Sequence, residues 1–138
     1  MKIQIYQKQN TKRIQNKMKT INYKNADSVN NPHGVDARKL HSNEHVQVVH
    51  IHLKAGENLK KHATPVDVFF YVLEGEGIVE IGDEKQVVTK DMLIESPKSI
   101  PHCLYNESNA DFRVLVVKTP GPTTDQNKQA IQSMLNSK

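Results

Sequence analysis

The stretch GENLKKHATPVDVFFYVLEG, residues 56–75, decides the fold of this chain. It begins within a turn at residues 54–58 and contains one histidine, His62. Residues 68–73 then read Val-Phe-Phe-Tyr-Val-Leu, a β-branched and aromatic run that predicts a strand with both faces apolar. The stretch ends in Glu-Gly-Glu-Gly, where glycine permits the positive φ of a tight turn.

Strand patterns continue on both sides of this stretch. The further expected strands cover residues 46–53, 78–81, 86–89, 92–94 and 112–117. Turn signals recur about every ten residues, which is typical of an all-β sandwich or barrel. Helical spacing occurs only after Pro122, where Ile131, Met134 and Leu135 form one apolar stripe and Thr124 or Asp125 can cap a helix.

Two motifs within the strand-rich region resemble those of the cupin superfamily, and the resemblance covers about residues 36–120. The first family motif is Gly, five residues, His-x-His, three or four residues, Glu, six residues, Gly. Residues 56–75 keep the two glycines and His62, but Thr64 stands at the second His position and Val68 at the Glu position.

The second motif of the family is Pro-x-Gly-x-x-His-x-x-x-Asn, and residues 97–106, PKSIPHCLYN, resemble it. His102 and Asn106 are kept, whereas Ser99 replaces the glycine. A further glycine that normally precedes this motif is also missing, and Lys90-Asp91 stands there.

The resemblance implies an all-β fold, a single cupin barrel (double-stranded β-helix or jelly roll), here followed by a short C-terminal helix. It also implies a homodimer. Members of the superfamily hold a divalent metal such as iron, manganese, zinc or nickel with three His and one Glu. Two imidazoles alone make a poor metal site, so the ligand set of this chain is incomplete.

Other residues near the motifs are candidates to complete a metal site. The candidate metal ligands are His62, His102, His50, His52 and Asp67. The alternative is that His50 and His52, which lie opposite Ile51 and Leu53 on their strand, face water or bond to backbone carbonyls.

A small organic ligand is the other use of the same interior. The candidate ligand-binding residues are His62, Thr64, His102, Phe70 and Tyr105. Packing in the core is the alternative for Phe70, and Tyr105 can instead pack its ring and keep its hydroxyl in water. Cys103 is expected to be a buried, unreactive thiol.

Three functions remain open from the sequence, and no catalytic residue is assigned. The first is a small-molecule-binding cupin, the second a metal-dependent dioxygenase or isomerase, and the third a sensing module or scaffold. Fold alone does not fix function. The loss of two metal-ligand positions favours the small-molecule-binding cupin over the metal-dependent enzyme.

The charge distribution divides the chain into three parts. Residues 1–30 carry seven Lys or Arg and one Asp, and are predicted to be a loosely ordered basic segment. Residues 31–120 form the β domain, and residues 121–138 a helical tail. The rest of the chain after residue 30 has 12 basic and 14 acidic residues, which argues against nucleic-acid binding.

Compartment and partners follow from what the sequence lacks. No apolar run is long enough for a membrane span, and the basic N-terminal segment has no apolar core of a signal peptide. The single cysteine excludes an internal disulfide. We therefore expect a cytoplasmic protein. Its expected partners are a small molecule bound in the barrel and a second copy of the chain, which the resemblance implies.

Overall fold

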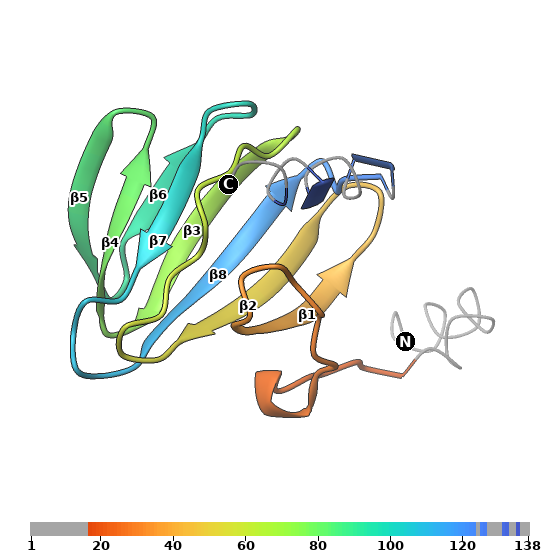
Figure 1. Cartoon of the computed structure of the whole chain (residues 1–138). Helices are drawn as coiled ribbons and strands as arrows, with labels where there is room; N and C mark the ends of the chain where they lie inside the picture. The colour runs from red at the N-terminus through yellow and green to blue at the C-terminus, as the bar shows by residue number, and fades with distance from the viewer. Residues whose placement is uncertain (1–16, 124, 127–130, 133–134, 136–138) are drawn as a thin grey trace, which may run out of the picture.

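The computed structural model describes residues 17–123, 125–126, 131–132 and 135, and shows an all-β fold of antiparallel strands (Figure 1). The strands are β1 (Asp36–Ser42), β2 (Gln47–Leu53), β3 (Asp67–Glu74), β4 (Glu76–Ile81), β5 (Glu84–Thr89), β6 (Leu93–Ser96), β7 (His102–Tyr105) and β8 (Phe112–Thr119). The first sheet has the order β1-β2-β8-β3-β6, and the second has the order β5-β4-β7.

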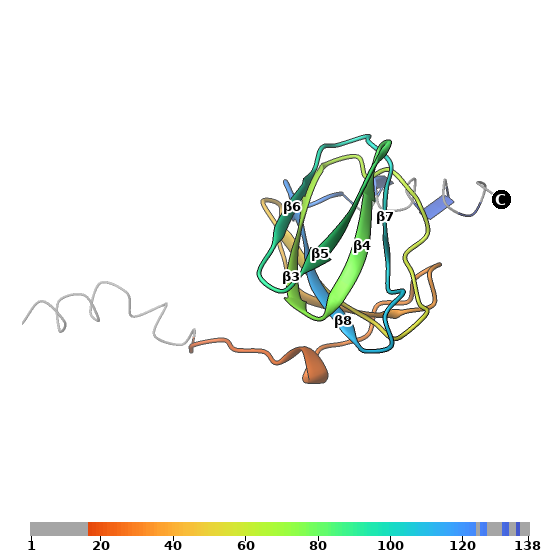
Figure 2. The same ribbon diagram turned by 90° about the vertical axis from the view of Figure 1, so that its left-hand side faces the viewer.

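The two sheets face each other, as the view along the strands shows (Figure 2). The chain passes from the first sheet to the second at the β3–β4 turn. Within the described residues β1 and β6 are edges of one sheet and β5 and β7 edges of the other. The predicted all-β class is therefore confirmed, although these strands form two open sheets rather than a closed barrel.

The core lies between the sheets and follows from the period-2 alternation of the strands. In β3, Val68, Phe70 and Val72 are buried, and β8 presents Phe112 and Val114 to the same interior. Burial of each such side chain contributes about 1.5–3 kcal/mol. The position at which the family pattern has Glu is thus filled by a core valine, Val68.

Strand β1 was not predicted, because its sequence, DARKLHS, has little apolar alternation. Only Ala37 is buried in it. Arg38 holds the strand from outside: its Nε donates to Asp36 Oδ1 at 3.0 Å, and its NH1 donates to the carbonyl of Ala26 at 3.1 Å. Pairing with β2 and these polar contacts, rather than an apolar pattern, define this edge strand.

Backbone geometry explains the glycine at the end of the first motif. Gly75 has φ +84, and a Cβ there would lie 2.1 Å from the carbonyl oxygen of Asp111. The two motif glycines that this chain lacks are replaced by residues that still adopt positive φ, 71 at Asp91 and 66 at Ser99. The backbone of the family pattern is therefore kept although the glycines are not.

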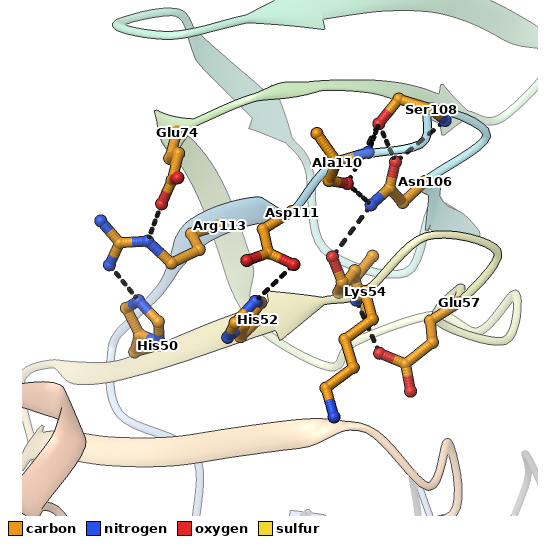
Figure 3. Close-up of polar contacts among 11 residues, drawn as sticks. His50, His52, Lys54, Glu57, Glu74, Asn106, Ser108, Ala110, Asp111 and Arg113 are labelled. Atoms are coloured by element: carbon orange, nitrogen blue, oxygen red, sulfur yellow. Dashed lines mark hydrogen bonds and ion pairs between the residues drawn. The ribbon is translucent and has the colours of Figure 1, made fainter.

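Asn106, the last residue of the second motif, has a structural role. Its Nδ2 donates to the carbonyl of Leu53 at 2.9 Å and to that of Ala110 at 2.7 Å, while its Oδ1 accepts from Ser108 (Figure 3). The side chain is fully buried. It joins the end of β2 to the loop before β8, which explains why the fold needs an amide there.

The described part of the N-terminal segment packs on the outer face of the first sheet. A short 3-10 helix, η1 (Tyr23–Asn25), places the Tyr23 ring on that of His50, with 3.9 Å between centroids. Ser28 forms a β-bridge with Arg38. Contacts with the β domain therefore begin before residue 31, the boundary expected from charge.

The predicted C-terminal helix depends on Thr124 and Met134, which lie outside the described residues, as do residues 1–16. That helix, and the loose order of residues 1–16, stay predictions. Within the part of the chain that the structure describes, no helix is long and apolar enough to cross a membrane.

Candidate functional site

The two histidines that the motifs predicted as a pair, His62 and His102, lie side by side. Their residues form an isolated antiparallel bridge, in which each N–H donates to the other carbonyl at 3.1 and 2.9 Å. The ring centroids are 4.7 Å apart and the planes meet at 82°. The segment before β3 and the start of β7 thus bring both imidazoles to one point between the sheets.

His102 is the buried member of the pair and is held on both ring nitrogens. Nδ1 lies 2.7 Å from the Ser96 hydroxyl, and Nε2 lies 3.3 Å from Oγ1 of Thr64. Phe70 meets the ring edge-on, with 5.2 Å between centroids. Burial, followed by the neighbouring His62, lowers the pKa of His102 to about 3, so this imidazole is neutral at pH 7.

A third imidazole, His33, lies next to His62, with 5.3 Å between ring centroids. The loop before β1 carries it, and Asn31 fixes that loop by accepting from the His33 N–H at 3.1 Å and donating to the carbonyl of Val35 at 3.0 Å. Burial and the nearby His62 lower the pKa of His33 to about 4. Burial also lowers the pKa of His62.

Sequence reasoning missed His33 because it precedes both motifs and no spacing connects it to them. Its position depends on the path of an irregular loop, which a period-2 pattern does not describe. The only signal was a turn, Asn31-Pro32-His33-Gly34, directly before the strand-rich region.

The three imidazoles line a cavity of about 260 Å³ that opens between the sheets. Its apolar wall includes Val49, Ile51, Leu59, Phe70 and Val116. Its polar wall includes the three imidazoles and Asn30, Asn31, Gln47, Thr64, Lys39 and Lys118. Among the described residues that line it there is no Asp or Glu.

Lys118 is the partly buried cation of this cavity. It follows Val114 and Val116 at the same parity of β8, so its side chain turns to the interior. Burial lowers its pKa, and the nearby Lys39 adds to that effect. No carboxylate within the described part of the chain forms an ion pair with Lys118 or Lys39.

The structure does not bring His50 and His52 to this cavity (Figure 3). Strand β2 turns Gln47, Val49 and Ile51 inward and therefore turns both histidines to the outer face. The Nε2 atom of His50 accepts from Arg113, whose Nε also donates to Glu74. The Nε2 atom of His52 lies 3.2 Å from Asp111 Oδ1, in an ion-pair contact without hydrogen-bond alignment.

Asp67 and Tyr105 also lie away from the imidazoles. Asp67 is exposed and its Oδ1 accepts from the backbone N–H of Lys98 at 2.9 Å. The hydroxyl of Tyr105 accepts from the thiol of Cys103 at 3.0 Å, on the face of β7 opposite His102. Of the five residues predicted to bind a ligand, the cavity therefore collects His62, Thr64, His102 and Phe70.

The donors at the cavity do not fit a divalent metal. Nδ1 of His33 accepts a bond from the N–H of Lys60, so the proton of this ring is on Nε2 and that atom has no free lone pair. His62 and His102 are left without the third nitrogen or carboxylate that a stable site needs. No group of three His, Cys, Asp or Glu arranged for a metal occurs in the described residues.

Comparison with known proteins identifies the family. The family described as Cupin domain matches residues 49–118, which is half of the chain, and the chain therefore belongs to the cupins. The match runs from β2 through β8 and includes both motifs.

Individual proteins are also similar to this chain. An uncharacterized protein of Methanocaldococcus jannaschii, MJ1618, is 34% identical over 62 residues, which cover 45% of this chain and about half (49%) of that protein. The crystal structure of TT1209 from Thermus thermophilus is 28% identical, covers 76% of this chain and 100% of its own, and has a TM-score of 0.66. An RmlC-like cupin from Shewanella frigidimarina is 18% identical, covers 79% and 96% of the two chains, and has a TM-score of 0.67, which shows a shared fold.

Proposed function

We propose that this protein is a cupin that binds a small organic anion in its cavity without a metal. The observation that carries the proposal is the charge of the wall: two ammonium groups, Lys39 and Lys118, and no described carboxylate. A partly buried ammonium is costly without an anionic partner, and a bound carboxylate would supply one.

The rest of the wall supports an organic ligand rather than a bare ion. Ile51, Phe70 and Val116 provide apolar surface opposite the polar groups. A cavity of about 260 Å³ accommodates a molecule of roughly ten non-hydrogen atoms, near the lower end of the usual size of ligand sites. The chemistry that fits is therefore a carboxylate on a compact apolar body.

The test compares phenylacetate with its uncharged isostere phenylacetamide by NMR titration of the imidazole signals. We expect the carboxylate to bind at least about tenfold more tightly, and Lys118→Met to remove that preference. The exposed Lys85, which lies over Tyr105 on another face, gives the matched control Lys85→Met.

Three results would overturn the proposal. The first is equal binding of acid and amide, and the second is equal binding by wild type and Lys118→Met. The third is the absence of any carboxylate binding up to high millimolar concentration. Elemental analysis of untagged protein belongs to the same experiment: a full equivalent of a transition metal, required for binding, would favour the metal-dependent alternative instead.

A further inference from the structure

The backbone of Lys60 bonds to two imidazoles of the cavity through two consecutive peptide groups. Its N–H donates to Nδ1 of His33 at 2.7 Å, and its carbonyl accepts from Nδ1 of His62 at 2.9 Å. The neighbouring backbone is fixed, because Leu59 donates to the carbonyl of Leu104 at 2.9 Å and residue 62 pairs with residue 102. The backbone at Lys60 is therefore held in place by its pairing with β7 on both sides.

A peptide N–H can only donate and a carbonyl can only accept, so these two bonds fix the tautomers. In His33, Nδ1 supplies a lone pair, which places the proton on Nε2. In His62, Nδ1 carries the proton, which leaves the lone pair on Nε2 of the neutral ring. The Nε2 atom of His33 is thus a hydrogen-bond donor, whereas the Nε2 atom of His62 is an acceptor.

Both Nε2 atoms are available to a ligand. Neither has a hydrogen-bond partner within the described residues, and neither is among the buried nitrogen atoms without a partner, which belong to His50 and His52. His33 and His62 both line the cavity that Lys118 enters, with their ring centroids 5.3 Å apart. A donor and an acceptor therefore lie side by side near the ammonium group of Lys118, which no described carboxylate pairs with.

We propose that His33 and His62 together recognise a hydroxyl group of a small hydroxycarboxylate. A hydroxyl oxygen accepts from Nε2–H of His33 while its hydrogen is donated to Nε2 of His62. A carbonyl group satisfies only His33, and a methylene group satisfies neither ring. This inference rests on the proposed function for the carboxylate, which Lys118 would hold, and adds the second group of the ligand.

The test uses three acids with one skeleton: mandelate with a hydroxyl, phenylglyoxylate with a carbonyl and phenylacetate with a methylene. Their dissociation constants are measured at pH 7.5 for both mandelate enantiomers. We expect one mandelate enantiomer to bind about tenfold more tightly than the other two acids. His33→Asn, which keeps an acceptor near Lys60 but lacks the distal N–H, should reduce this preference to within about twofold.

The matched control is His45→Asn, since His45 is an exposed histidine with no contact to the cavity. It should leave the preference unchanged. Equal affinities of the three acids in the wild type, all lost in Lys118→Met, would overturn the hydroxyl recognition while leaving the anion site intact. A hydroxyl preference that persists in His33→Asn would overturn the role of His33.

A measurement without ligand tests the tautomers directly. Two-bond proton–nitrogen correlation spectra distinguish protonated from unprotonated ring nitrogens, and should show the proton on Nε2 in His33 and on Nδ1 in His62. The opposite result for either ring overturns this inference whatever the acids do. Failure of all three acids to bind, with the tautomers as stated, would instead overturn the anion site on which the inference depends, and the inference with it.

Discussion

The Ser96 hydroxyl lies 2.7 Å from Nδ1 of His102, and both residues are buried. This bond joins the end of β6 to the start of β7 beneath the cavity. Ser96→Ala would leave a buried ring nitrogen without a partner, which costs about 1–3 kcal/mol. Urea unfolding at pH 7 should show this loss, whereas Ser42→Ala, at the exposed end of β1, should change stability by less than about 0.5 kcal/mol.

Ser99→Gly should stabilise the protein. Ser99 holds φ 66, a conformation that costs a residue with a side chain about 1–2 kcal/mol. Glycine removes that cost but gains entropy in the unfolded chain, about 0.5–1 kcal/mol, so the expected net gain is about 0.5–1 kcal/mol.

The control for this prediction is Ser42→Gly at the end of β1, where the backbone does not adopt positive φ, and this variant should lose stability. The Ser99 hydroxyl makes no hydrogen bond with any described residue, while its N–H donates to the carbonyl of Thr64 at 2.8 Å and would persist. A loss of stability in Ser99→Gly would contradict the argument from backbone strain.

Stability should fall as pH decreases from 7 to 5. The folded protein holds His102 with a pKa of about 3 and both His33 and His50 with a pKa of about 4, whereas each ring has a pKa near 6.5 when unfolded. The unfolded state therefore binds more protons in this window, and each ring contributes a slope of up to about 1.4 kcal/mol per pH unit. The stabilisation is complete above pH 6.5 and decreases below it.

The free energy of unfolding measured at several pH values tests this slope. His50→Gln removes one of the rings whose pKa burial lowers and should make the dependence shallower, although its stability at pH 7 is also lower. Ser42→Ala, which removes no titratable group, should keep the wild-type slope. An unchanged slope in His50→Gln would show that burial does not depress the pKa of this ring.

Tyr23→Ala should destabilise the domain by about 1–2 kcal/mol. Tyr23 stacks on His50 at 14° between planes, and the Arg113 guanidinium lies 4.8 Å from its ring centroid. Tyr23→Phe keeps the ring and should stay within about 0.5 kcal/mol of wild type. Equal stability of all three proteins in denaturant unfolding would mean that the 3-10 helix contributes nothing to the fold.

Much of the fold was predictable because β3 and β8 are rich in β-branched and aromatic residues, and turn residues bound these runs. Strand β1 was not, because an edge strand held by Arg38 and by pairing with β2 needs no apolar face. A pattern of apolar residues predicts strands that bury a face, and it does not predict an edge strand that is held by polar contacts.

The candidate site was predictable where it coincides with the motifs. The resemblance placed His62 and His102 together, and the structure adds Thr64 as a direct partner of His102. The alternation of His50 and His52 with Ile51 indicated that both histidines lie on the outer face of the sheet. They were nevertheless candidate metal ligands, because the two motif histidines alone do not complete a metal site. The position of His33 beside His62 could not be predicted, because it depends on the three-dimensional path of the irregular loop before β1.

The bonds from Lys60 belong to its backbone, and every amino acid except proline carries the same N–H and carbonyl. The side chain at position 60 is thus free to change without altering what the two imidazoles present. In an engineered variant, substitutions there would tune surface charge while leaving recognition unaffected. Proline is the exception, because it has no backbone N–H to donate to His33, although its carbonyl could still accept from His62.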